Sequence, residues 1–252
     1  MRWFALLTFL FATPLAALEL TLRDFYELDR PASLEFDPDF CGLWIANESR
    51  EAVLYTLDGL ELRRVSSDLP RIKAIALEGS SLLVADGFGR FQRLTRDGET
   101  LGEPFRLGRA LDTEGIALAA DGTILSVEDE PGHLLWQGAD GTVKRRIDGY
   151  AVDPIMHEPQ GIEIDHRNGH ILVTDDWEGT NSLFEFSPEG ELLGIAPLLA
   201  YGRDPEGIAL RPSTNTLFIA FDGGARIAAF DYVPTGGIDA DAAVPGADCV
   251  MF

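Results

Sequence analysis

The chain has 252 residues, of which 46% are hydrophobic and 10% aromatic, so it holds enough apolar material for a sizeable core. Its 42 acidic residues outnumber its 20 lysines and arginines, and the formal net charge is −22. This charge repels phosphate backbones and anionic lipid, which argues against nucleic-acid and membrane-surface binding. It suits cations, or it serves only to keep the surface soluble.

The first 17 residues have the pattern of a secretory signal peptide. Arg2 precedes an apolar run over residues 3–11, and mostly small residues follow as far as Ala17. The run is too short to span a bilayer. A retained membrane anchor is the alternative. With cleavage after Ala17, we expect residues 18–252 to form one periplasmic or secreted domain with no membrane span.

Residues 18–28 have strand composition, with leucines alternating at positions 18, 20 and 22. They are similar to the segments 143–147 and 192–195 further along the chain. The C-terminal part lacks such a segment and becomes rich in Gly, Pro, Ala and Asp from Val233 onward. We predict that the N-terminal strand completes the last sheet, which would cover edges otherwise left open.

One hairpin phrase is repeated along the rest of the chain. Its clearest copies are DTEGIALAADGTILSVED at 112–129, EPQGIEIDHRNGHILVTDD at 158–176 and DPEGIALRPSTNTLFIAFD at 204–222. Looser copies begin at residues 31 and 71. One register position per copy falls at Ser33, Ala74, Gly115, Gly161 and Gly207, with spacings of 41, 41, 46 and 46 residues.

An all-strand repeat of about 40 to 50 residues indicates the blades of a β-propeller. Turn residues arrive at the regular intervals that an antiparallel meander needs. We therefore predict an all-β chain with a single propeller of five four-stranded blades, or six if the C-terminal tail contains another.

The two cysteines, Cys41 and Cys249, lie in the first repeat and three residues from the C-terminus. An even pair in an exported chain suggests a disulfide. A closed ring brings its first and last blades together, so this bond would fasten the closure. Two separate reduced thiols are the alternative.

Acidic residues gather at one end of the predicted channel. The residues just before the register position should line its mouth, and they are Ala32, Lys73, Glu114, Gln160 and Glu206. The second strand of each blade ends on the same face, often with carboxylates. Convergent carboxylates repel one another unless a cation, a proton or a basic group joins them. Oxygen ligands of this kind suit calcium.

The sequence therefore predicts a calcium site, with candidate ligands Glu114, Gln160, Glu206, Glu128 and Asp175. Two alternatives need no metal. The acidic residues could form a structural network that caps turns, binds neighbouring backbone and pairs Lys73 with Glu114 or Glu206, or they could contact a substrate directly.

Other side chains near the mouth could contact a ligand. His157 and His133 are candidate general bases near neutral pH, or ordinary polar loop residues. Trp177 could form an apolar wall, or pack between blades. Lys73 and Arg203 are the candidate basic contacts.

The three clear copies of the phrase resemble the inner strands of calcium-associated propellers. The chain is similar to the SdiA-regulated family of exported bacterial propellers and to the phytase-like propellers described as having esterase-like activity. It resembles gluconolactonase and NHL-repeat propellers more distantly. The gluconolactonase-like relatives carry a calcium ligand just before the register glycine, which implies Glu114, Gln160 and Glu206 here. Lys73 and Ala32 depart from that pattern.

These observations lead to two expectations for function. The first is an exported propeller whose mouth binds calcium and a small-molecule or protein ligand. The second is a calcium-dependent hydrolase of a lactone, ester or phosphoester, with His157 or His133 transferring the proton. The sequence leaves the choice open. It contains no Gly-x-Ser-x-Gly, phosphate-loop, HExxH or CxxC motif.

Overall fold

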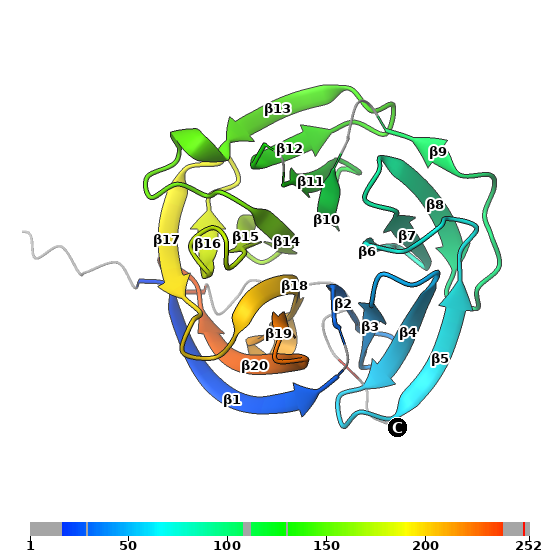
Figure 1. The fold of residues 1–252 in the computed structure, drawn as a ribbon, viewed down its shortest axis with the longest axis horizontal. Coiled ribbons are helices and arrows are strands. Elements are labelled where there is room, and N and C mark those ends of the chain that lie inside the picture. Colours follow the sequence, from blue (N-terminus) through cyan, green and yellow to red (C-terminus); the bar gives the residue numbers. More distant parts are fainter. Residues whose placement is uncertain (1–16, 29, 108–111, 130, 239–248, 250–252) are drawn as a thin grey trace, which may run out of the picture.

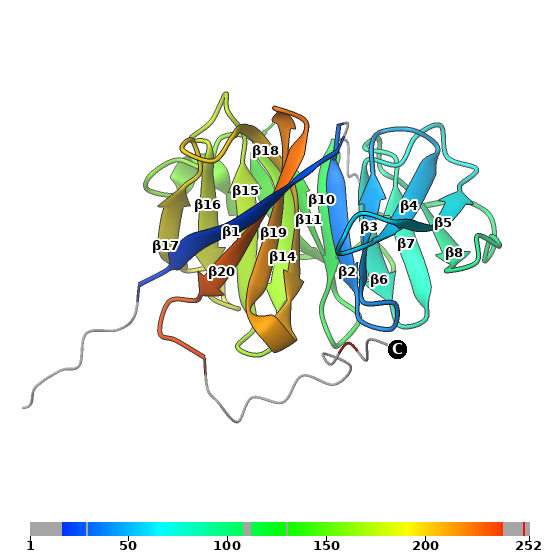
Figure 2. The same ribbon diagram turned by 90° about the horizontal axis from the view of Figure 1, so that it is seen from below.

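The computed structural model describes residues 17–28, 30–107, 112–129, 131–238 and 249. These residues form five four-stranded antiparallel sheets, which surround a central axis as blades (Figure 1). Seen from the side, the inner strands run along this axis (Figure 2). The predicted five-bladed propeller is therefore confirmed, and the described residues contain no sixth blade. Within them, no helix is long and apolar enough to cross a membrane. The predicted signal peptide and most of the C-terminal tail lie outside the described residues.

Blades 1 to 4 follow the chain from the innermost strand outward. Blade 1 consists of β2 (Ser33–Asp37), β3 (Gly42–Ala46), β4 (Glu51–Thr56) and β5 (Glu61–Ser66). Blade 2 consists of β6 (Ala74–Glu78), β7 (Ser81–Ala85), β8 (Arg90–Thr95) and β9 (Phe105–Arg106). Blade 3 consists of β10 (Thr113–Leu118), β11 (Ile124–Glu128), β12 (His133–Gln137) and β13 (Val143–Asp148). Blade 4 consists of β14 (Pro159–Asp165), β15 (His170–Asp175), β16 (Ser182–Phe186) and β17 (Leu192–Pro197).

Blade 5 takes its outermost strand from the N-terminus. It consists of β18 (Arg203–Arg211), β19 (Thr216–Gly223), β20 (Arg226–Val233) and β1 (Glu19–Glu27). β1 pairs antiparallel with β20 from Glu19 opposite Val233 to Glu27 opposite Arg226. The prediction that an N-terminal strand completes the last blade is confirmed.

The turn between the third and fourth strands uses glycine in each of the first four blades. The glycines have positive φ angles, which L-residues with side chains rarely adopt. They are Gly59 (φ 87°), Gly98 (φ 90°), Gly141 (φ 77°) and Gly190 (φ 83°). This shared requirement explains the regular Asp-Gly and Glu-Gly signals in the sequence.

Adjacent blades pack through the faces of their sheets. Between blades 1 and 2, Trp44, Leu54, Leu82 and Val84 are fully buried in one cluster. The inner strands approach so closely near the axis that a Cβ added at Gly161 would collide with the carbonyl oxygen of Glu206. Gly115 and Gly207 meet the next inner strand in the same way, so the register glycines set the spacing around the channel.

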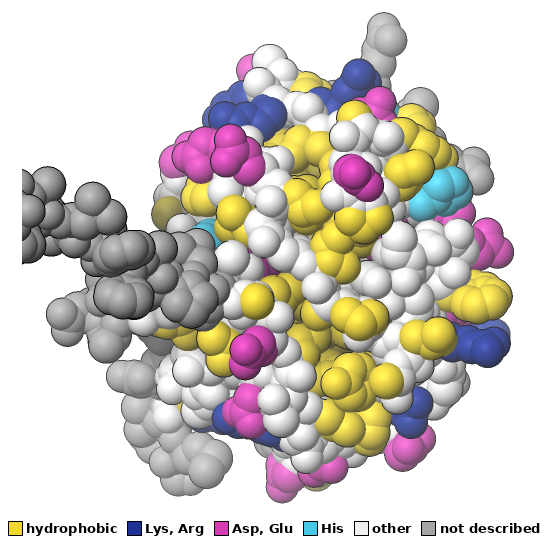
Figure 3. Space-filling model, turned by 90° about the vertical axis from the view of Figure 1, so that its left-hand side faces the viewer, with side chains coloured by type: hydrophobic (Ala, Val, Ile, Leu, Met, Phe, Trp, Pro, Cys, Tyr) yellow, Lys and Arg dark blue, Asp and Glu magenta, His cyan; other side chains and the backbone are white. Residues whose placement is uncertain are grey.

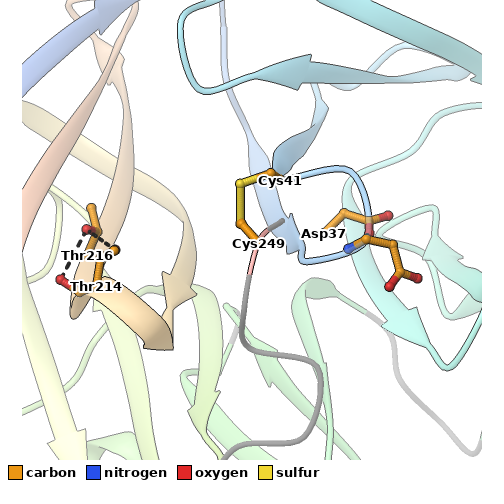
Figure 4. The surroundings of a disulfide bond; sticks show 6 residues. Asp37, Cys41, Thr214, Thr216 and Cys249 are labelled. Atoms are coloured by element: carbon orange, nitrogen blue, oxygen red, sulfur yellow. Dashed lines mark hydrogen bonds between the residues drawn. A yellow bond between two sulfur atoms is a disulfide. The ribbon is translucent and has the colours of Figure 1, made fainter. Parts of the chain in front are cut away.

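A disulfide joins Cys41, in the loop between β2 and β3, to Cys249, with 5.0 Å between the Cα atoms (Figure 4). It connects the first blade to the C-terminal end of the chain, as the positions of the two cysteines predict.

The outer strands differ in how they protect their free edges. β5 and β13 each carry several charged residues, which oppose pairing with another chain. β17 has the sequence LLGIAP, without a charge. Hydrophobic side chains gather on the side of the molecule that carries β17 (Figure 3).

Candidate functional site

Three inner strands change register where they reach the mouth of the channel. The pairing shifts between Thr113 and Gly115 in β10, and similarly in β14 and β18, whereas β2 and β6 pair without a shift. A β-bulge redirects the side chain at its position. The shifted strands are those that carry Glu114, Gln160 and Glu206, the polar residues of the predicted ring.

Lys73 holds the carboxylates of the ring together. Its Nζ lies 2.7 Å from Glu114 Oε2, 3.2 Å from Glu206 Oε2 and 3.0 Å from Glu48 Oε1. Ala32 stands between Lys73 and Glu206 in the ring, and its small side chain leaves room for this reach. Burial alone would lower the pKa of Lys73, but Glu206 and Glu114 raise it well above its ordinary value. Lys73 therefore remains an ammonium ion.

Three carboxylates converge on one side of this ring, between blades 4 and 5. One oxygen from each of Asp176, Asp204 and Glu206 lies within 4.8 Å of the other two, and all three residues are half-buried. Asp204 has a positive φ of 62°, a conformation that aspartate tolerates better than most residues.

Crowding and burial make these carboxylates difficult to ionise together. Burial raises the pKa of Glu206 to about 7, with Glu114 and Asp204 adding to the effect and Lys73 opposing it. Burial also raises the pKa of Asp176 to about 6, helped by Asp204 and Glu158. A cation at this point would relieve the repulsion.

Gln160 lies between Glu114 and Glu206 in the ring. The residue is 6% exposed, and its Oε1 has no hydrogen-bond partner among the described residues. A buried acceptor without a donor is costly, so this oxygen is available to a cation or to a donor on a ligand.

Two predicted metal ligands make other contacts. Asp175 is fully buried, and its carboxylate accepts hydrogen bonds from the backbone N–H groups of His157, Glu158 and Thr180 and from the Thr180 hydroxyl. It thus holds the loops together. Glu128 Oε2 lies 3.4 Å from His133 Nδ1, on the neighbouring strand.

His157 lies in the loop before β14, close to the acidic cluster. Its Nε2 is 3.1 Å from the hydroxyl of Tyr150, and its Nδ1 is 3.4 Å from Glu158 Oε1. The backbone N–H of Asp176 donates a hydrogen bond to the carbonyl oxygen of Glu158, the residue that follows His157. This bond connects the loop of His157 to the acidic cluster.

Trp177 and Arg203 stack on each other beside the cluster. The guanidinium carbon of Arg203 is 4.9 Å from the centre of the Trp177 ring, and Trp177 is 51% exposed. The three predicted ligand contacts therefore lie in two places. Lys73 is held by carboxylates inside the ring, whereas Trp177 and Arg203 form a stacked pair outside it, here called the platform.

The sequence-based ligand set omitted Asp204 and Asp176. One signal could have identified Asp204, because the three clear copies of the phrase carry an acidic residue three positions before the register glycine: Asp112, Glu158 and Asp204. Choosing Asp176 over Asp175 needed the direction of each side chain at the end of β15, which the alternation along the strand does not supply.

A second pair of carboxyl groups lies deeper in the channel. Glu163 Oε2 accepts a hydrogen bond from Leu210 N in the next inner strand. Burial raises the pKa of Glu35 well above its ordinary value, with Glu163 adding to the rise and the backbone N–H of Leu77 opposing it. Because blade 5 separates β2 from β14 in the ring, the two carboxyl groups approach across the channel.

We expect the Glu163→Gln variant to lose part of the pH dependence of stability. Burial raises the folded pKa of Glu163 to about 7, opposed by the N–H groups of Ile164 and Leu210 and assisted by Asp165, whereas the ordinary value is 4.5. The resulting stabilisation is complete below pH 4.5 and is lost as pH rises through 7. Between pH 5 and pH 8.5, the free energy of unfolding measured by urea titration should fall by roughly 1 to 3 kcal/mol less in the variant than in the unsubstituted protein. The exposed Glu189→Gln serves as control, and a fall equal to that of the unsubstituted protein would contradict the expectation.

Comparisons with known proteins support the fold. No family model matches the chain, and no curated protein matches its sequence. Among solved structures, it is similar to a glutaminyl cyclase from Myxococcus xanthus, with 13% identity and a TM-score of 0.67 over 84% of this chain and 96% of that one. It is also similar to the WD40 propeller domain of Doa1, with 14% identity and a TM-score of 0.53 over 79% and 62% of the two chains. Virginiamycin B lyase from Staphylococcus aureus matches with 17% identity and a TM-score of 0.50 over 79% and 65%. These likenesses show that the chain is a β-propeller.

Proposed function

We propose that this propeller binds a divalent cation, calcium, at Asp176, Asp204 and Glu206, and uses it to bind a ligand at the channel mouth. The observation that supports this proposal is the convergence of these three carboxylates, with one oxygen of each within 4.8 Å of the others. The site lies to one side of the channel axis, because Lys73 already pairs with Glu114 and Glu206 Oε2.

The donor set favours calcium over softer metals. Calcium takes six to eight oxygen ligands in a flexible arrangement, whereas zinc and copper prefer nitrogen and sulfur. The cluster offers carboxylate oxygens, and Gln160 Oε1 is an unpartnered oxygen in the adjoining ring position. The sequence resemblance to calcium-associated propellers supports the same choice.

We expect calcium to raise the melting temperature of the mature protein after treatment with a chelator. Free calcium at 100 times its Kd adds about 2.7 kcal/mol to the free energy of unfolding, which corresponds to a rise of about 5 °C or more for a chain of this size. Asp204→Asn should remove most of the rise, and the exposed Asp222→Asn should keep it. The absence of any rise in the unsubstituted protein would overturn the cation site.

The disulfide supports export to an oxidising compartment, since such bonds form and persist outside the cytosol. We therefore propose that the protein acts in the periplasm or outside the cell as a ligand- or partner-binding module, as its sequence resemblance to the SdiA-regulated and phytase-like propellers implies.

The second candidate function is a calcium-dependent hydrolase of a lactone, ester or phosphoester. The observation in its favour is His157, which lies between Tyr150 and Glu158 and close to the loop of Asp176. A bound cation would polarise the scissile group, and His157 would accept the proton. His157→Asn should then abolish turnover in a screen of lactones and phosphoesters and leave the effect of calcium on melting unchanged.

A further inference from the structure

The platform formed by Arg203 and Trp177 adjoins the proposed cation site through the chain itself. Trp177 follows Asp176, and Arg203 precedes Asp204, so each platform residue is next to a carboxylate of the cluster. The guanidinium carbon lies 4.9 Å from the ring centre. A ligand bound to the cation can therefore also contact this pair.

The hydrogen-bond donors of Arg203 are not used. Among the described residues, the Arg203 guanidinium stacks on Trp177 and makes no hydrogen bond or ion pair. Arg71, which also enters the mouth, differs: it pairs with Glu48 and donates to the carbonyl oxygen of Asp86. A guanidinium group has five donors in a planar fork that fits two oxygens of a carboxylate. Stacking holds this fork in place, which lowers the entropy lost on binding.

The charges near the platform permit an anion once the cation is bound. Asp176, Asp204 and Glu206 carry three negative charges when ionised; calcium and Arg203 together supply three positive ones. The three carboxylates also leave some of the six to eight calcium coordination positions open. A ligand oxygen can fill such a position while a second oxygen accepts from Arg203.

We propose that the mouth binds an organic carboxylate, whose oxygens bridge the calcium ion and Arg203 and whose apolar body lies against Trp177. This inference rests on the proposed cation site and names its ligand class. An organic cation fits less well, because Arg203 already covers one face of the indole ring and would repel it.

Phenylacetate and phenethylamine provide a matched pair of probes, since they have similar shapes and opposite charges. Trp177 is a suitable reporter because it is exposed, whereas Trp44 is fully buried. In calcium-loaded protein, phenylacetate should change the tryptophan emission with a Kd of about 1 mM, a reasonable value for so small a ligand. Phenethylamine should not. Trp177→Phe should abolish the signal.

Removal of calcium and Arg203→Gln should each weaken phenylacetate binding at least about tenfold, as the loss of a charge-assisted contact implies. Arg145→Gln is the matched control, because Arg145 also stacks on a tryptophan, Trp136, with 5.3 Å between guanidinium and ring, and it should leave the Kd unchanged. Binding of phenethylamine, binding of phenylacetate that ignores both changes, or no binding up to about 10 mM would overturn the proposal. If calcium still raises the melting temperature in any of these cases, the cation site stands without the carboxylate ligand.

Discussion

The Lys73→Met variant should lose about 3 to 5 kcal/mol of stability in urea denaturation at neutral pH with a chelator present, because it removes the ammonium group that pairs with the buried carboxylates of Glu114 and Glu206. In the folded protein, Nζ of Lys73 lies within 3.2 Å of oxygens on Glu48, Glu114 and Glu206. Without the ammonium group, Glu114 and Glu206 are left as charges that are buried away from water and repel each other, or they must take up protons. The methionine fills nearly the same volume, so the loss measures charge and not a cavity.

The chain contains one other lysine, which provides the control. Lys144 is exposed and donates to Thr123 Oγ1, and Lys144→Met should change stability by less than about 0.5 kcal/mol. Adding Glu114→Gln to Lys73→Met should recover part of the loss, since it removes one of the unpaired charges. A loss below about 1 kcal/mol in Lys73→Met would show that the ring does not depend on this ammonium group.

The second large effect is expected from Cys249→Ser, which should lower the free energy of unfolding by about 3 to 5 kcal/mol. The bond joins residues 208 positions apart, and a cross-link across so long a loop restricts the unfolded chain strongly. The disulfide is a second connection that closes the ring. The pairing of β1 with β20 keeps blade 5 complete when the disulfide is absent.

Three variants separate the bond from the loss of a single side chain. Cys41→Ser, Cys249→Ser and the double variant should be equally destabilised, because each lacks the same bond. Reducing agent should lower the stability of the unsubstituted protein to the same level and leave the variants unaffected. Equal stability of the double variant and the oxidised protein would contradict the expectation.

The sequence predicted the features that repeat. Five copies of the hairpin phrase, the Asp-Gly turns and the leucine alternation of residues 18–28 were sufficient for the blade count and the closure. These features are local or periodic, so they can be read without knowing how the blades touch. The ring of residues before the register glycines was predicted for the same reason.

The contacts across the ring were harder to predict. Lys73 reaches Glu206 past the small side chain of Ala32, and the sequence alone left its neutralising role as one of three alternatives. Asp175 and Asp176 are neighbours at the end of one strand, yet one is fully buried in backbone contacts and the other faces the mouth. Asp204 takes part through its positive φ. These outcomes depend on side-chain direction and local backbone, which strand periodicity does not specify.

The pairing of β1 with β20 fixes the order in which the molecule can be completed during synthesis. β1 precedes all the other described strands in the chain, and its partner β20 (Arg226–Val233) follows them. Blades 1 to 4 are each built from one continuous segment and can form as the chain emerges. Blade 5 cannot be completed until both β1 and β20 have been made. The ring therefore stays open until β20 has been made, and the channel mouth, which needs Glu206 of blade 5, is completed only after blades 1 to 4.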